Sequence, residues 1–226
     1  STASAGRKPT NTCGRAGNDA ANHRGGAKNA EAGKAVPMNA AFLPGLDVLA
    51  LSKNDWVKGR RIGLVSHPAA IGVRGAPAVK VLADAGANLA ALFGPEHGFF
   101  GTETAGKRID DALHPQLKIP VYSLYGAAQR PTDAMLENLD AIVFDMQDLG
   151  ARFYTYVSTL RYVLEAAARN GKEAIVLDRP IPLPDAIDGP VLDDRFASFV
   201  ACIPAPMSYG MTPGETRESE LTFPAD

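Results

Sequence analysis

Short apolar runs alternate with amphipathic segments along most of the chain. Continuous apolar runs are typical of strands buried on both faces, whereas apolar positions three and four apart are typical of helices. The runs predict strands over 61–65, 89–93, 120–125, 141–145 and 174–178, with a sixth over 199–203. Helices are predicted between them over 76–85, 133–139 and 154–170, with Thr132 as a cap and Gly86 and Gly171 as stops.

This alternation predicts an α/β fold. Buried strands separated by amphipathic helices form a mostly parallel sheet with helices on both faces, because each parallel connection has to cross over the sheet. Right-handed crossovers then produce a doubly wound, Rossmann-like layer.

The ends of the chain depart from this pattern. Residues 1–36 contain no Leu, Ile, Phe, Tyr or Trp, and such a segment cannot bury enough apolar surface to offset the entropy of ordering it. We therefore expect a disordered or foreign lead over 1–36, one Rossmann-like domain over 37–215 and an irregular, truncated tail over 216–226.

Composition narrows the class of protein. Of the 226 residues 46% are hydrophobic and the formal net charge is −2, which favours a globular core and argues against nucleic acid or an anionic membrane as a partner. No run is long enough for a membrane span, and no signal peptide is visible. The two cysteines, Cys13 and Cys202, exclude a disulfide framework but leave one bond between them possible, and no metal site is expected.

Polar residues collect where the predicted strands end. The carboxyl ends of parallel strands meet at one edge of the sheet, and ligands bind there. His67 follows the first strand, Glu96 and His97 follow the second, and Arg179 follows the fifth. The fourth strand ends in the richest group, which comprises Asp145, Gln147, Asp148, Arg152, Tyr154 and Tyr156.

The segment Gly94-Pro95-Glu96-His97-Gly98 is the sharpest single motif. Flanking glycines allow a tight turn and the close approach of a ligand. A carboxyl group in a partly dry site can serve as a general acid. The alternative is structural, with Glu96 capping a helix and His97 packing on Phe99.

The group after the fourth strand has the mixture of side chains that suits a carbohydrate site. Carboxylates and amides bind hydroxyls, and aromatic faces cover the apolar side of a sugar ring. Arg152 could form a bidentate pair with a substrate carboxylate. The alternative is an i,i+4 pair between Asp148 and Arg152, with Tyr154 and Tyr156 packed in the core.

Several nucleotide and hydrolase motifs do not occur in the sequence. No Gly-x-Gly-x-x-Gly follows a strand and there is no Walker loop, which argues against dinucleotide or triphosphate binding. The Gly-x-Ser-x-Gly elbow of serine hydrolases is also missing.

Five motifs in order resemble the bacterial exo-β-N-acetylmuramidase family, long known only as a domain of unknown function. They are GPEHGF (94–99), VYSLYG (121–126), FDMQDLGARFYTY (144–156), LDRP (177–180) and GMTPGE (210–215). One departure is Ile181, which stands where the family usually has Asn.

The resemblance implies removal of terminal β-1,4-linked N-acetylmuramic acid from the non-reducing ends of peptidoglycan fragments, such as muropeptides or disaccharides, by a secreted or periplasmic enzyme without a cofactor. It also implies a smaller second domain, which we expect to lie outside this chain. Glu96 is the expected catalytic acid. The expected substrate-binding residues are His67, His97, Gln147, Asp148, Arg152, Tyr154, Tyr156 and Arg179.

The second catalytic group is left open by the sequence. Asp145 is the first choice and Asp148 the second, as nucleophile or base. Assistance by the substrate's own N-acetyl group, with Asp145 orienting it, is an alternative mechanism. A sugar-binding fragment without turnover is an alternative function.

Overall fold

The computed structural model describes residues 43–52 and 56–220. The predicted lead over 1–36, Cys13 with its possible bond to Cys202, and residues 221–226 of the predicted tail lie outside this part of the chain.

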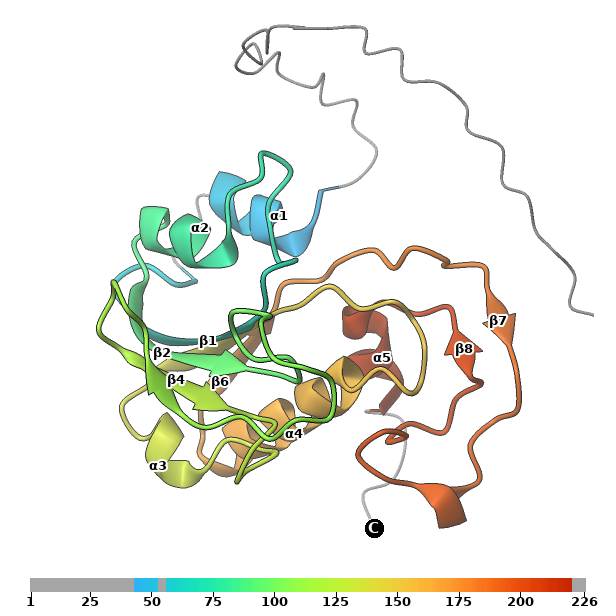
Figure 1. Ribbon diagram of the computed structural model, residues 1–226. Coiled ribbons are helices and arrows are strands. Elements are labelled where there is room, and N and C mark those ends of the chain that lie inside the picture. Colours follow the sequence, from blue (N-terminus) through green and yellow to red (C-terminus); the bar gives the residue numbers. More distant parts are fainter. Residues whose placement is uncertain (1–42, 53–55, 221–226) are drawn as a thin grey trace, which may run out of the picture. The chain divides into compact units, whose positions relative to one another are not determined.

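A six-stranded sheet forms the centre of the fold (Figure 1). Its order is β3-β4-β2-β1-β5-β6, and every neighbouring pair is parallel except β3 with β4. The strands are β1 (Arg61–Ser66), β2 (Asn88–Gly94), β3 (Ala112–Leu113), β4 (Pro120–Ser123), β5 (Ala141–Asp145) and β6 (Glu173–Val176). The five parallel strands therefore follow the Rossmann order 3-2-1-4-5, which confirms the predicted fold class.

Helices cover both faces of this sheet, as predicted. They are α1 (Gly45–Leu51), α2 (Ala78–Asp84), α3 (Asp133–Leu136) and α4 (Tyr156–Arg169), and a fifth helix, α5 (Pro213–Glu220), lies against α4. The Thr132 hydroxyl accepts the Met135 N–H at 3.4 Å and so caps α3 as expected. Gly171, with φ of 60°, follows the end of α4.

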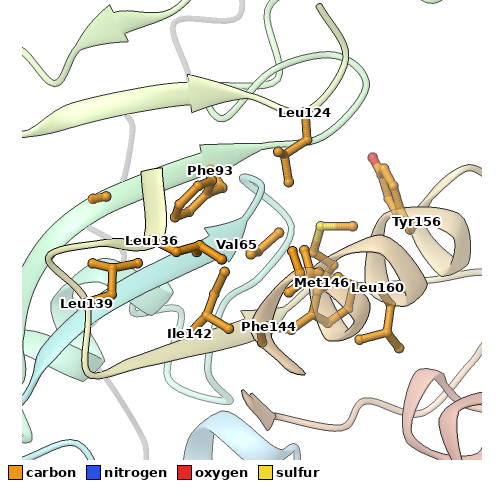
Figure 2. Close-up of a cluster of buried hydrophobic side chains, with 14 residues drawn as sticks. Val65, Phe93, Leu124, Leu136, Leu139, Ile142, Phe144, Met146, Tyr156 and Leu160 are labelled. Atoms are coloured by element: carbon orange, nitrogen blue, oxygen red, sulfur yellow. The ribbon is translucent and has the colours of Figure 1, made fainter. Parts of the chain in front are cut away.

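Two apolar clusters, one on each face, hold the layers together. Alternate residues of each strand point to opposite faces: in β5, Ala141 and Val143 join the cluster of α1 and α2, whereas Ile142 and Phe144 join that of α3 and α4. Figure 2 shows the second cluster, to which the sheet contributes residues such as Phe93 and Val65 and α4 contributes residues such as Leu160. Burial on both faces explains why the strands are apolar at almost every position.

The segment after β6 contains little regular structure, and here one prediction is wrong. Residues 199–203 do not form a sixth parallel strand, because Ser198 and Ala201 pair across a tight turn. Cys202 and Ile203 pack instead with Val157 of α4 in a third, smaller cluster. This segment also contains a short 3₁₀ helix, η1 (Asp194–Phe196), and a two-stranded sheet of β7 (Ile187–Asp188) and β8 (Ser208–Tyr209).

The last described helix, α5, also differs from expectation, because it continues to Glu220 where no regular structure was predicted after 216. Its start is a capping box: the Glu215 N–H donates to the Thr212 hydroxyl at 3.2 Å, and the Thr212 N–H donates to the Glu215 carboxylate at 2.8 Å. The Asp178 carboxylate, which follows β6, accepts the Thr212 hydroxyl at 2.7 Å and the Gly214 N–H at 2.8 Å. These bonds anchor α5 to the carboxyl end of the sheet.

Truncating the core of β2 should be costly. Leu92 is fully buried between the sheet and α2, so Leu92→Ala should lower the free energy of unfolding by about 2–5 kcal/mol. Leu113 on the edge strand β3 is 65% exposed, and Leu113→Ala should change stability by less than about 0.5 kcal/mol. Denaturant unfolding of both variants checks this, and equal losses would contradict the layered core.

Candidate active site

The strand order reverses between β1 and β5, and the loops that follow these two strands meet at this switch point. His67 follows β1 and Gln147 follows β5 by two residues. The backbone N–H of Gln147 donates to His67 Nε2 at 2.8 Å. The Gln147 side chain donates to the carbonyl groups of Asp148 at 3.0 Å and Pro180 at 2.7 Å, so its amide nitrogen holds the loops after β5 and β6 together.

Glu96 lies in a tight turn at the end of β2. The Gly98 N–H donates to the Pro95 carbonyl at 2.9 Å, and His97, third in the turn, has φ of 70°. Left-handed backbone is uncommon for a residue other than glycine and often marks a functional site. A side chain at Gly94 would lie 2.3 Å from the Phe99 nitrogen, which explains the glycine there.

Both oxygens of the Glu96 carboxylate are bound. Oε1 accepts the Gly106 N–H at 3.0 Å, and Oε2 accepts the Thr155 hydroxyl at 3.0 Å. The Glu96 carboxylate is therefore held by groups from two separate segments, the loop of Gly106 and the start of α4. It does not cap a helix, contrary to the structural alternative.

His97 is turned away from the expected packing on Phe99. Its Nδ1 lies 3.0 Å from the Glu103 carbonyl, and its own carbonyl accepts the Glu103 N–H at 3.2 Å. The Phe99 ring lies against Phe100 and His114 instead. His97 thus fastens the loop that carries Gly106 to the turn that carries Glu96.

Aromatic side chains line the neighbourhood of His67 and Glu96. The Tyr156 ring is edge-on to His67 and to Tyr154, with centroids 5.0 Å apart in each case. Burial, followed by the neighbouring Tyr154 and Glu96, raises the pKa of Tyr156 to about 12. Burial and then the Glu96 charge also raise the pKa of Tyr125. Both phenols therefore stay protonated and can donate hydrogen bonds at neutral pH.

Asp145 and Arg179 form a buried ion pair below this group. Arg179 donates through Nε at 2.6 Å and through Nη2 at 3.1 Å, so both oxygens of Asp145 are occupied. The side chains of the pair are 0% and 4% exposed. Burial raises the pKa of Asp145, and the bonds from Arg179 oppose that rise. This geometry gives the two residues a positioning role, and the assignment of Asp145 as second catalytic group stays a prediction.

Asp148 faces the segment after β6. Its Oδ1 accepts the N–H groups of Leu149 at 2.5 Å and Gly150 at 2.9 Å and the Tyr209 hydroxyl at 3.4 Å. Its Oδ2 is buried without a partner among the described residues. Burial is the main cause that raises the pKa of this carboxyl group. The role of Asp148 in substrate binding stays a prediction.

Arg152 binds carbonyl groups of the segment after β6. Its Nη1 donates to the Pro190 carbonyl at 2.8 Å and to the Ala205 carbonyl, and the side chain is buried. The Nη1 group therefore secures the segment between β7 and β8, and the described residues show no i,i+4 ion pair between Arg152 and Asp148. The pairing of Arg152 with a substrate carboxylate stays a prediction.

Sequence reasoning did not single out three residues around Glu96. The sequence could have indicated Thr155, because it directly precedes the long helix α4, at a position where Ser and Thr are favoured. Tyr125 lies in the VYSLYG motif and at the end of a predicted strand, but no role in the site was predicted for it. Gly106 lies in a loop without any pattern and contributes only its backbone, so no residue type could have indicated it.

Comparison with known proteins places the chain in a family. A family model described as "Exo-beta-N-acetylmuramidase NamZ, N-terminal" matches residues 62–219. The chain belongs to this family. The predicted resemblance is thereby confirmed.

A NamZ relative in Bacillus subtilis (strain 168), the "Peptidoglycan beta-N-acetylmuramidase NamZ", is 44% identical over 173 residues. The aligned region is 76% of this chain and 42% of the relative. The chain thus spans less than half the length of this relative.

Two crystal structures of DUF1343 family proteins from Bacteroides fragilis NCTC 9343 resemble the fold. One has a TM-score of 0.71 at 39% identity and covers 78% of this chain and 44% of that protein. The other has a TM-score of 0.65 at 29% identity and covers 77% of this chain and 45% of that protein.

Among residues 43–52 and 56–220, no group of three or more His, Cys, Asp and Glu side chains is placed to hold a metal ion. No helix in that part of the chain has the length and apolar character needed to cross a membrane.

The buried Asp148 carboxyl should make stability depend on pH. The pKa of this carboxyl group is raised above the ordinary value of 3.8, so the folded state keeps the proton to a higher pH than the unfolded state does. The free energy of unfolding therefore falls as the pH rises from the unfolded-state pKa to the folded-state pKa. Asp148→Asn lacks this charge, so its melting temperature relative to wild type should rise between about pH 4 and about pH 7. A constant difference across that range would contradict the raised pKa.

Proposed function

We propose that this chain carries the catalytic acid of an exo-β-N-acetylmuramidase and that the acid is Glu96. The observation that supports it is the fixed Glu96 carboxyl group at the carboxyl edge of a Rossmann-like sheet, bound by Gly106 on one oxygen and Thr155 on the other. A carboxyl group held in one orientation can present its proton to the oxygen of a glycosidic bond without a search through rotamers.

The proposed substrate is a peptidoglycan fragment with a terminal β-1,4-linked N-acetylmuramic acid at its non-reducing end. Membership of the family supports this, as does the name of the Bacillus subtilis relative. Such a substrate belongs to the cell wall, and we propose that the enzyme acts there as a secreted or periplasmic protein.

The partners of Glu96 suit a group that loses and regains a proton. A backbone N–H can only donate, so Gly106 marks Oε1 as the oxygen that stays unprotonated. The Thr155 hydroxyl donates to Oε2 and can keep doing so when that oxygen is protonated, which leaves the Oε2 proton free to point at the leaving group. Oε2 would then carry the proton that is transferred to the leaving group.

The centre that develops positive charge also needs stabilisation. A nucleophilic carboxylate would need an oxygen open to the sugar, and both oxygens of Asp145 already bind Arg179. This favours the version in which the acetamido oxygen of the substrate stabilises that centre. Asp145 would then act indirectly, by fixing Arg179 and the loops around the site.

Removal of the acid should abolish turnover. Glu96→Gln should reduce hydrolysis of a chromogenic β-N-acetylmuraminide on the order of 100-fold or more, because the amide cannot protonate the leaving oxygen. Glu103→Gln is the matched control, since it makes the same change in the same loop on a side chain paired with Lys107, and it should stay close to wild type. Equal rates in wild type and Glu96→Gln would contradict the role of Glu96. If the wild-type chain does not hydrolyse the substrate, the proposal that this chain is itself an active glycosidase is wrong.

The hydroxyl of Thr155 should matter for the rate rather than for binding. Thr155→Val keeps the shape but removes the bond to Glu96, so kcat should fall about tenfold or more with KM nearly unchanged. Thr155→Ser retains the hydroxyl and should recover most of the rate. Loss of activity in both variants, or in neither, would argue against positioning through this bond.

A further inference from the structure

His67 lies where the strand order reverses, and the hydrolysis step proposed above assigns it no role. Its Nε2 accepts the Gln147 N–H at 2.8 Å. A backbone N–H can only donate, so Nε2 carries no proton, and a neutral imidazole then carries its proton on Nδ1. The backbone of the neighbouring strand loop therefore selects the tautomer of His67.

The neighbours of His67 keep this ring neutral. Burial is the main cause that lowers its pKa to about 4, with smaller contributions from the neighbouring Arg179 and His97. Arg179 follows β6, His97 belongs to the turn after β2, and the Tyr156 ring of α4 lies edge-on to the imidazole. The ring thus keeps one donor and one acceptor throughout the pH range in which cells live.

The second ring nitrogen remains available to a ligand. Within the described residues, the hydrogen bond of His67 is the one between Nε2 and Gln147, and Nδ1 has none. Among the described residues, Asp148 Oδ2 is the side-chain nitrogen or oxygen atom that is both buried and without a hydrogen-bond partner. His67 Nδ1 also has no partner but is not buried in this sense, so a ligand can reach it. It is a donor of fixed direction at the edge of the sheet where Glu96 lies.

We infer that His67 is a substrate-binding residue whose Nδ1–H donates a hydrogen bond to an oxygen of the terminal sugar. The inference rests on the proposed function and deepens it, because a fixed, uncharged donor selects an acceptor such as an acetamido carbonyl, a hydroxyl or a carboxylate oxygen and disfavours an amine or ammonium group. This is specificity by unpaired polar groups: a sugar without the acceptor would leave the N–H unsatisfied.

Two substitutions separate the two ring nitrogens. His67→Gln extends an amide to the place of Nε2, so it can still accept the Gln147 N–H but has lost the Nδ1 donor. His67→Asn places an amide near Nδ1, so it can still donate to the sugar but has lost the bond to Gln147. Each variant is thus the control for the other.

The test combines calorimetric binding of N-acetylmuramic acid with thermal melting of the same samples. His67→Gln should bind the sugar about three- to tenfold more weakly than wild type, as expected for one neutral hydrogen bond, while melting close to it. His67→Asn should melt lower but retain more of the affinity. The reverse pattern, or equal affinity in all three proteins, would overturn the proposed donor.

Comparison of sugars identifies the acceptor oxygen. N-acetylglucosamine lacks the lactyl group, and glucosamine also lacks the acetyl group. If the acceptor is the acetamido carbonyl, His67→Gln should weaken binding of the first of these two sugars and leave that of the second unchanged. A loss confined to N-acetylmuramic acid would assign the bond to the lactyl group instead, and an equal loss with all three sugars would assign it to a shared hydroxyl.

Nitrogen NMR of the histidine rings tests the tautomer without any sugar or turnover. The His67 signals, identified by their loss in His67→Gln, should show a protonated Nδ1 and an unprotonated Nε2 from about pH 5 to about pH 8. A proton on Nε2, or a charged ring within this range, would overturn the inference even if the chain hydrolyses its substrate. If the wild-type chain binds no sugar, the donor role and the proposed function of this chain fail together, whereas the tautomer is decided by the spectrum alone.

Discussion

The buried ion pair between Asp145 and Arg179 is the interaction on which the site depends. Two charges removed from water are tolerated only when they are paired with good geometry, and removal of one partner typically costs about 3–5 kcal/mol. Here the pair joins the end of β5 to the third residue after β6, and Arg179 Nη1 also donates to the Ile71 carbonyl in the loop after β1, at 2.9 Å. Three strand ends are thereby held at fixed distances from one another, and chemistry above them can rely on those distances.

Above this pair, backbone groups do much of the positioning. The Gln147 N–H orients His67, and the Gly106 N–H orients Glu96. Backbone donors have no rotamers and cannot change protonation state, so they determine which atom of each side chain faces a ligand. In the proposed enzyme, one loop would therefore present a proton donor for cleavage and another would present a neutral donor for recognition.

The sequence predicted strands correctly where every residue of the strand is buried. It did not predict conformations or side-chain roles that depend on contacts with distant segments. The run 141–145 coincides with β5 because a strand buried on both faces has to be apolar throughout. The run 199–203 is equally apolar, yet its residues cover α4 around a turn, and a short run cannot distinguish these cases. Arg152 shows the same limit in the site: its type suits a carboxylate, but the carbonyl groups that it binds, Pro190 and Ala205, come from a distant segment. Glu96 was predicted because two glycines and a strand end mark its turn.

The most direct test of a sugar site at this edge is a crystal structure of the Glu96→Gln variant with a bound muramic acid disaccharide. We expect the terminal sugar at the carboxyl ends of β1, β2 and β5, with its glycosidic oxygen within hydrogen-bond distance of residue 96, on the side that faces Thr155. A disaccharide bound at another face of the sheet, or with that oxygen far from residue 96, would contradict the proposed role of this carboxyl group.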